Sequence, residues 1–467
     1  MGGWYPAGSG AVQAAVPLPI TSDGRHAILS PDDPMSEPTA PTSDLRTAPL
    51  RLAPLVLMAF MLPWEFLTVL AVYEEKTFRF FDTLVTATPS DVAGVVFLVL
   101  SGPTVWRRVI DARRSPGVHL VGWLLAAAAV SYAFNPTLRG LSLLIRLAVV
   151  VVVVLEVAAM PRRRARMMVA APLVAGVAVA GVIAAIQIVV GGRIGILGEQ
   201  SVFSVAGPFV RPSGTSTHPY MLAGLSLVAS AVGVAFAGRR ARPLWIAATG
   251  LAAIPLGLSF SRAVLVSFLL LVPLWMFAWR NDPGRHARPL VAVLVGFAVP
   301  ALVFGQGWLA RVDDSLTTDL DSISSQRLEI ARIALEIIGD HPVVGVGPWN
   351  YALASEPEYE DGTLPSPVHN TVLLITAEMG VVAGVGYVVF LALLAIRIGR
   401  RRPAALALLA APFGLWLFDT IPWFYPSGLL LFGLQVGLVC SLIPAGPRRT
   451  PGGGEAPVAA GADAVTA

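Results

Sequence analysis

The sequence predicts an all-α fold: a polytopic helical membrane protein with about twelve transmembrane helices. Of its 467 residues, 55% are hydrophobic and only 13% are charged, whereas soluble domains have about 25% charged residues. Apolar segments of membrane-spanning length recur along the chain. Arginines gather in every second loop between these segments. Together these three observations favour a protein whose core lies in lipid.

The apolar segments define the expected helices in chain order. Most contain the roughly 17–25 residues that a helix needs to cross the hydrocarbon layer. They lie near residues 52–73, 88–106, 117–134, 139–160, 167–190, 218–237, 243–260, 263–280, 288–305, 371–396, 403–418 and 425–443. Of these, 88–106 and 403–418 carry the weakest signals.

Loop charge predicts the orientation of the helices. The loops after the second, fourth, sixth, eighth and tenth segments are rich in arginine, and the loops between them are poorer. Because basic loops remain in the cytoplasm, both termini are expected there. The loops near 191–217 and 306–370 then lie outside, and the second is by far the longest. The same clustering of arginine in short loops argues against nucleic acid as a partner, although the isoelectric point is about 9.5.

The chain divides into a transmembrane domain, 51–443, between two tails. Residues 1–50 and 444–467 are of low complexity and are expected to be disordered cytoplasmic tails. Residues 306–370 form a large external loop within the domain. Lys76 is the single lysine beside many arginines, which is typical of a GC-rich bacterial genome. The expected location is therefore the bacterial cytoplasmic (inner) membrane, with many spans.

The long external loop is expected to contain a short amphipathic helix. Residues 326–339, capped by Ser324 or Ser325, have helical periodicity. One face is apolar and consists of Ile330, Ala331, Ala334, Ile337 and Ile338. Arg327 lies at the N-terminal end of this face. It either binds an anion or a partner, since an unpaired buried charge is costly, or extends to water.

Two histidines flank the rest of this loop. His341 begins a stretch rich in glycine and proline, 341–350, which predicts a tight turn. His369, followed by Asn370, stands directly before an apolar segment. A histidine at the outer membrane boundary has a pKa suited to a general base. The alternative is an interfacial histidine without a catalytic task.

Four arginines share the outer side, where arginine is normally rare. Arg262 stands between two apolar segments with almost no loop, Arg211 precedes the sixth segment, and Arg146 lies in the outer half of the fourth; Arg327 is the other. Charges in such positions tend to be functional. Several arginines without a matching number of embedded acids indicate an anionic ligand, and pyrophosphate suits arginine forks.

Three glutamates lie within apolar segments. Glu156 is expected to pair with Arg162–Arg164, and the sequence assigns no role to Glu65 or Glu378. Walker A, His-Glu-x-x-His and Gly-x-Ser-x-Gly motifs are absent from the sequence, and neither a metal nor a cofactor is expected.

As a set, five short motifs resemble the O-antigen ligase/polymerase family. They are Arg-Pro-Ser-Gly-Thr-x-x-x-Pro (211–219), Ser-Arg-Ala (261–263), Gln-Arg-Leu (326–328), His-Pro-Val-Val-Gly-Val-Gly-Pro (341–348) and His-Asn-Thr-x-Leu (369–373). The motifs cover roughly residues 200–395, and the topology extends the resemblance to the whole chain.

The resemblance implies a GT-C-like membrane glycosyltransferase of surface polysaccharide biosynthesis. Such an enzyme takes a glycan from an undecaprenyl-pyrophosphate carrier on the outer face of the membrane. It transfers the glycan to a lipid or protein acceptor, or to another carrier-linked glycan, with inversion and without a metal. By position, Arg211, Arg262 and Arg327 would hold the pyrophosphate, and His369 would activate the acceptor hydroxyl. Arg146 is a further candidate for the pyrophosphate, and His341 and Asn370 are candidates for substrate binding.

One departure from the family adds a candidate residue. Many relatives have Asn-Pro-Asn where this chain has Thr217-His218-Pro219-Tyr220, so His218 is a second candidate histidine for substrate binding. Two other classes of function remain as alternatives, a polysaccharide transporter or flippase and a non-catalytic assembly protein. A transporter would usually show a repeat between its halves, which this sequence does not. Ligase and polymerase are not separated by the sequence.

Overall fold

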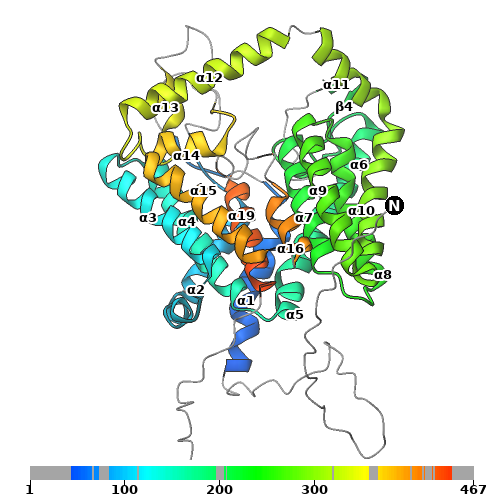
Figure 1. Ribbon diagram of the computed structural model, residues 1–467, viewed down its shortest axis with the longest axis horizontal. Helices are drawn as coiled ribbons and strands as arrows, with labels where there is room; N and C mark the ends of the chain where they lie inside the picture. The colour runs from blue at the N-terminus through cyan, green and yellow to red at the C-terminus, as the bar shows by residue number, and fades with distance from the viewer. Residues whose placement is uncertain are drawn as a thin grey trace, which may run out of the picture. The chain divides into compact units, whose positions relative to one another are not determined.

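Helices account for most of the residues that the computed structural model describes (Figure 1). The described residues are 44–65, 68–72, 84–112, 115–195, 205–206, 208–317, 320–356, 367–399, 402–412, 415, 423 and 426–443. Most of the expected N-terminal tail and all of the C-terminal tail lie outside them. Residues 49–467 belong to one unit, to which the following description refers.

Each apolar segment of the sequence contains a helix. In chain order these are α1 (Asp44–Met61), α2 (Pro89–Ala112), α3 (Pro116–Phe134), α4 (Leu138–Ala158), α6 (Ala171–Val190), α7 (Pro219–Ala235), α8 (Pro243–Leu258), α9 (Arg262–Asn281), α10 (Pro283–Val303), α14 (Thr371–Met379), α15 (Val381–Ile398), α16 (Pro403–Ala410) and α19 (Pro426–Ser441). The short α5 (Arg162–Ala165) and the wider turn η2 (Arg166–Ala170) lead directly into α6.

Six helical segments among the described residues are long and apolar enough to cross a membrane. They are 116–134, 138–158, 162–190, 262–281, 283–303 and 381–398. Shorter apolar helices of 10–17 residues occupy 50–61, 89–102, 219–235, 243–258 and 427–441. Several of these are almost completely buried, α7 above all. The protein is thus a multi-pass membrane protein.

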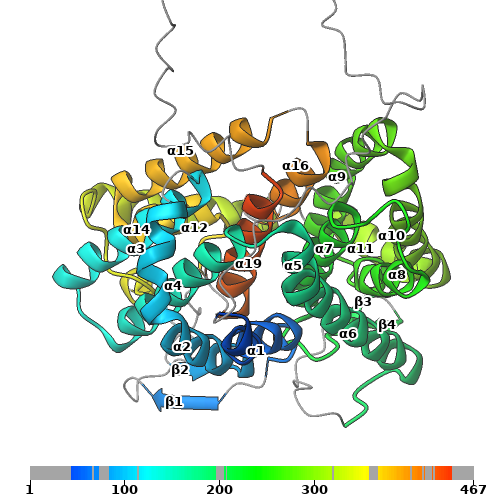
Figure 2. The same cartoon turned by 90° about the horizontal axis from the view of Figure 1, so that it is seen from below.

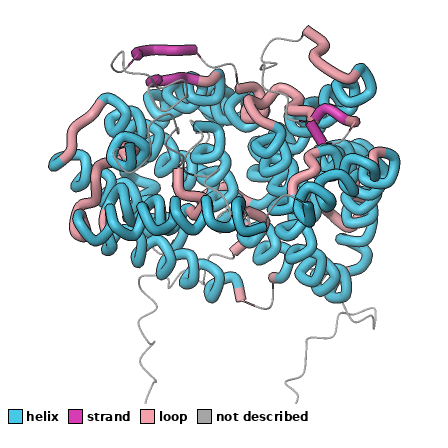
Figure 3. Tube along the Cα trace, turned by 90° about the horizontal axis from the view of Figure 1, so that it is seen from above, coloured by secondary structure: helices cyan, strands magenta, loops and turns pink. Residues whose placement is uncertain are grey.

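The first and tenth expected spans differ from the structure. The helix of the first ends at Met61, because Pro63 cannot continue it. The chain then forms strand β1 (Thr68–Val72), which pairs with β2 (Leu84–Ala87). The tenth is divided at Gly380, whose φ of +88° separates α14 from α15. A second strand pair, β3 (Val205–Ala206) and β4 (Phe209–Val210), lies in the loop before α7, and both pairs are small additions to the helices (Figure 3).

The long loop of residues 306–370 is more helical than the sequence suggests. Its described part contains α11 (Gly305–Thr317), α12 (Leu320–Asp340) and α13 (Tyr351–Ser355). The expected amphipathic helix is therefore longer and starts at Leu320, so the expectation that Ser324 or Ser325 caps it is wrong. Of its expected apolar face, Ile330, Ala334 and Ile337 are buried and Ala331 and Ile338 are half-buried; Ile333, which was not expected on this face, is buried too.

Helix packing determines where the loops meet. The helix α8 packs on α6, α7 and α10, while α4 packs on α2, α3 and α19. The last helix, α19, also contacts α7 and so connects these two groups (Figure 2). In Figure 1, α11, α12, α13 and β4 lie at one end of the long helices and α5, with its arginines, lies at the other. The two loops that the sequence places outside therefore share one end.

Candidate functional site

Residues 211–218, called here the arginine loop, connect β4 to α7. Gln187 of α6 holds its middle: the amide of Gln187 donates to the carbonyl of Gly214 (2.9 Å) and accepts from its N–H (2.8 Å). The loop is buried over nearly its whole length. Its serine, threonine and glycine residues thus contact protein, and they fix the position of Arg211 at the start of the loop.

Arg211 joins the arginine loop to the turn between α8 and α9. Its Nε donates a hydrogen bond to the carbonyl of Ser259 (2.8 Å). The turn continues through Phe260, with φ of +47°, to Ser261, whose hydroxyl caps α9. Arg262 is the first residue of α9 and is exposed. Two arginines that are 51 positions apart in the sequence are therefore carried by segments in direct contact.

The helix α11, in the long loop, packs on the same turn. Trp308 donates from its indole N–H to the carbonyl of Gly257 (2.9 Å), and its ring meets Phe260 edge to face at 5.7 Å. Phe260 is completely buried in this contact. A bulky residue with positive φ is strained, and this packing holds it in place. The conformation of the turn before Arg262 therefore depends on its packing against α11.

Arg311, one helical turn after Trp308, adds a further cation. Burial, and then the charge of Arg311, lower the pKa of Arg211 to about 10, so its guanidinium remains protonated at neutral pH. Sequence reasoning missed Arg311. The signal was present, because Arg311 is one more arginine in a loop expected to be external. Like charges held near each other indicate a place for an anion.

Arg146 has a different environment. Its guanidinium forms a buried bidentate ion pair with Asp91 (2.9 and 3.1 Å), donates to the hydroxyl of Ser142 (2.9 Å) and lies over the ring of Trp349. Thr88 also donates to Asp91 from its N–H and its hydroxyl. A carboxylate within the fold thus pairs with Arg146, whose expected contact with the pyrophosphate stays a prediction.

Glu156 also has a partner other than the one expected from the sequence. It pairs with Arg51 of α1 (3.3 Å), not with Arg162–Arg164. Arg162 instead donates to the carbonyl of Ala235 at the end of α7 (2.9 Å). This ion pair lies near the C-terminal end of α4, whereas Arg146 lies in its N-terminal half.

Arg327 lies on α12, one turn before the buried part of the helix. It continues the line of Ile330, Ala334 and Ile337, but its side chain is exposed. Arg332, by contrast, points away from this face and pairs with Glu329 (2.7 Å) and Glu336 (2.6 Å). The hydrogen bond from Arg332 lowers the pKa of Glu329. Two arginines on one helix thus have distinct surroundings.

The turn of residues 341–350 packs against the end of α14. The N–H groups of Val346 and Gly347 donate to the carbonyls of Ala377 and Glu378 (both 3.0 Å). Gly345 has φ of +66°, and a Cβ at this position would overlap the backbone of Glu378. The expected tight turn is confirmed, and its glycines serve close packing. His341, at the start of the turn, is exposed.

His369 and Asn370 stand at the start of α14. The side-chain oxygen of Asn370 accepts from the N–H groups of Val372 and Leu373 (both 3.0 Å), so Asn370 is the helix cap. His369 is half-buried directly before it. Since α12 packs on α14, His369 and Arg327 belong to neighbouring helices.

His218 also caps a helix. Its Nδ1 accepts a hydrogen bond from the N–H of Tyr220 at the start of α7 (3.2 Å). With Nδ1 as acceptor, the neutral ring carries its proton on Nε2. In this tautomer His218 can donate to a ligand, but it is a poorer candidate than His369 for a general base.

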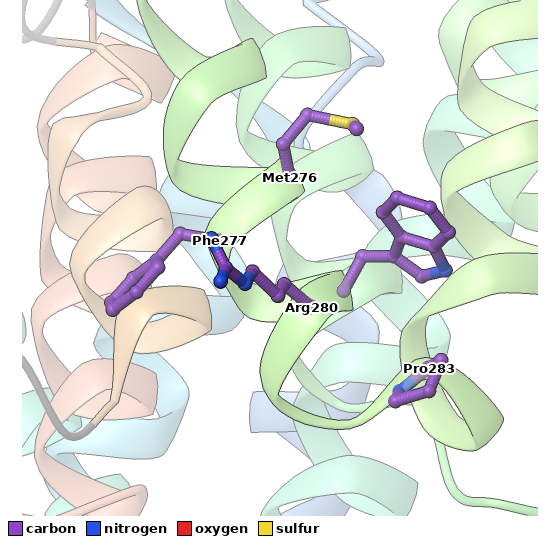
Figure 4. A pocket seen from close by; sticks show the side chains of 5 residues that line it. Met276, Phe277, Arg280 and Pro283 are labelled. Atoms are coloured by element: carbon purple, nitrogen blue, oxygen red, sulfur yellow. The ribbon is translucent and has the colours of Figure 1, made fainter.

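A surface pocket of about 460 Å³ lies away from these residues. Its lining consists of Met276, Phe277, Trp279, Arg280 and Pro283 (Figure 4). It is at the C-terminal end of α9, whereas Arg262 begins this helix. A helix of 20 residues is roughly 30 Å long, so the pocket is separate from the arginine turn.

Comparison with known proteins gives one match. Residues 245–388 match the family model described as O-Antigen ligase, and the match includes Arg262, Arg311, Arg327 and His369. Arg211 and His218 lie before it. A search of curated proteins finds no match to this chain. The family match indicates a membrane protein with a glycan-transfer role in surface polysaccharide synthesis. Residues 245–388, from α8 into α15, are therefore similar to the O-antigen ligase family.

Proposed function

We propose that this protein transfers a glycan from an undecaprenyl-pyrophosphate carrier to an acceptor hydroxyl or a growing glycan. The reaction takes place on the outer face of the bacterial cytoplasmic membrane, inverts the anomeric carbon and needs no metal. One observation carries the proposal: the buried Arg211 is bonded to the turn that presents Arg262, with Arg311 close by. Cations gathered in this way favour a ligand with several negative charges.

The arginines act on the leaving group. When the bond between the sugar and the pyrophosphate breaks, its electron pair moves to the phosphate oxygen. Guanidinium groups bind such oxygens with two parallel hydrogen bonds. Positive groups that are already in place stabilise the new charge without reorganisation, and more strongly where water is scarce. The buried Arg211 provides such a group, while the exposed Arg262 and Arg327 reach the ligand from α9 and α12.

His369 acts on the acceptor. As the acceptor oxygen attacks the anomeric carbon, its proton moves to the neutral imidazole. The cap formed by Asn370 fixes the backbone beside His369. The helix α12, which carries Arg327, packs on α14, which follows His369. The proposed cations and base thus come from different segments, which is compatible with attack and departure on opposite faces of the sugar.

The test uses a strain that lacks this gene. Lipid-linked glycans and surface polysaccharide are extracted after complementation with the wild type, Arg262→Ala, His369→Ala or the control Arg240→Ala. Arg240 is an exposed arginine in the turn between α7 and α8, on the side expected to be cytoplasmic. We expect carrier-linked glycan to accumulate on the outer leaflet and to be cleared by the wild type and the control. Loss of a general base slows such a step by about 10²–10⁴-fold.

The accumulated material distinguishes the remaining possibilities. Single repeat units on the carrier would identify a polymerase, and full chains would identify a ligase. Glycan trapped on the inner leaflet would contradict the proposal and identify a flippase. If Arg262→Ala and Arg327→Ala each clear the carrier-linked glycan normally, these two arginines do not bind the pyrophosphate.

A further inference from the structure

Glu65 is a buried carboxyl group to which the proposed chemistry gives no task. It lies four residues after the end of α1, and only 1% of its surface is exposed. A carboxylate in such a place is costly unless several donors bind it. Its contacts therefore show what it does for the fold around it.

Glu65 binds the C-terminal part of the arginine loop. Its Oε2 accepts hydrogen bonds from the N–H (2.8 Å) and the hydroxyl (2.7 Å) of Thr217. Its own N–H donates to the carbonyl of Thr215 (3.2 Å). The neighbouring carbonyl of Pro63 accepts from the hydroxyls of Thr215 (2.8 Å) and Ser216 (3.2 Å). Residues 63–65 and 215–217 are thus joined by five hydrogen bonds.

A third segment meets the same carboxylate. The hydroxyl of Ser427, in the first turn of α19, donates to Oε1 of Glu65. On the other side of the loop, Gln187 of α6 holds Gly214. The arginine loop is therefore fixed from two sides, and Glu65 connects it with both the first and the last helix of the described chain.

We propose that Glu65 is a positioning residue for the anion site: its carboxylate holds the arginine loop so that Arg211 reaches the turn before Arg262. This rests on the proposed function, because it assumes that Arg211 binds pyrophosphate. Without the carboxylate, the N–H and hydroxyl of Thr217 would be buried without an acceptor. The loop would then shift, and Arg211 would move with it. Gln187 holds Gly214, three positions before Thr217.

The experiment measures the affinity of the purified full-length protein for inorganic pyrophosphate by isothermal titration calorimetry. The variants are Glu65→Ala, Glu65→Gln, Thr217→Val, Arg211→Ala and the double variant Glu65→Ala/Arg211→Ala. The matched control is Glu156→Ala, which removes another buried carboxylate far from the loop. Thermal unfolding of every variant is recorded, and if Glu65→Ala does not fold, Thr217→Val carries the test.

We expect Glu65→Ala to weaken pyrophosphate binding roughly tenfold, as for partners in one hydrogen-bond network. Glu65→Gln, which keeps one acceptor oxygen, restores most of the affinity, and Thr217→Val has a smaller effect of the same kind. In the Arg211→Ala background, Glu65→Ala has no additional effect. Glu156→Ala lowers the unfolding temperature but leaves the affinity unchanged.

Two results would overturn the inference, and they are distinguishable. If Arg211→Ala weakens binding while Glu65→Ala and Thr217→Val do not, or if the effects of Glu65→Ala and Arg211→Ala simply add, Glu65 does not act through Arg211. If the wild type does not bind pyrophosphate, or Arg211→Ala binds it equally well, the proposed function fails and the inference fails with it.

Discussion

The surroundings of Arg146 and Arg211 form two regions that differ although both arginines are buried, with 5% and 8% of their surface exposed. Arg146 faces Asp91, which accepts two of its hydrogen bonds. Arg211 donates to the carbonyl of Ser259, and its charged neighbours include Arg311, which lowers its pKa. The carboxylate of Asp91 balances the charge of the first guanidinium, while the charge of Arg311 disfavours the protonated form of the second.

We propose that this difference distinguishes a structural arginine from one that binds a ligand. Burial alone does not separate them, because each is covered by protein. The sign of the neighbouring charges does, since a guanidinium already paired with a carboxylate gains little from an added phosphate. Three experiments test the contrast.

The largest effect is expected from Asp91→Ala, which leaves the charge of Arg146 buried without its carboxylate. Breaking one partner of a buried ion pair costs about 3–5 kcal/mol of stability. The unfolding midpoint in detergent measures the loss. The double variant Asp91→Ala/Arg146→Met should regain most of it, because no charge then remains unpaired. An unchanged midpoint for Asp91→Ala, with weaker pyrophosphate binding, would instead return Arg146 to the ligand site.

Arg211→Ala should affect the reaction rather than the fold. Removing one group that stabilises developing negative charge slows an enzyme by about 10²–10³-fold. Arg211→Lys should recover only part of this, since lysine lacks the planar fork. Glycan transfer in membranes provides the measurement, and Asp91→Ala/Arg146→Met is the comparison. If both arginine sites prove equally important for transfer, the distinction between them is invalid.

The smallest effect on glycan transfer is expected from a substitution on α12. There, Arg332→Ala is the matched control for Arg327→Ala. Arg327→Ala should lower transfer roughly tenfold, as the loss of about 1.5 kcal/mol from one charged hydrogen bond would do. Arg332→Ala should leave transfer unchanged, because its exposed pairs with Glu329 and Glu336 contribute little. Equal activity of the two variants would remove Arg327 from the proposed site.

The helices were predictable from the sequence, since each apolar segment contains one. Hydropathy reports where a segment is apolar, but it does not report where the backbone turns. The break at Gly380 was therefore missed, because glycine is common in transmembrane helices and does not by itself signal a corner. The early start of α12 was missed for the opposite reason, since residues 320–325 are polar and resemble a loop.

The arginines of the candidate site could be recognised from the sequence, because they lie in segments expected on the outer side, where arginine is rare. Their partners were not, because a partner depends on which helices pack together. Asp91 lies 55 positions before Arg146, in the weakest of the early apolar segments, and nothing in the sequence joins them. For the same reason the contact of Glu65 with Thr217, 152 positions later, required the structure. Whether the candidate residues bind substrate remains a prediction.

The close contact between the turn 341–350 and the corner at Gly380 limits how this protein can evolve. A Cβ at Gly345 would overlap the backbone of Glu378, and one at Gly380 would overlap the carbonyl of Val343. Neither position tolerates even a methyl group, because the obstacle in each case is main chain rather than a side chain that could be exchanged. Substitutions that change what this protein binds are therefore expected at positions other than these two glycines.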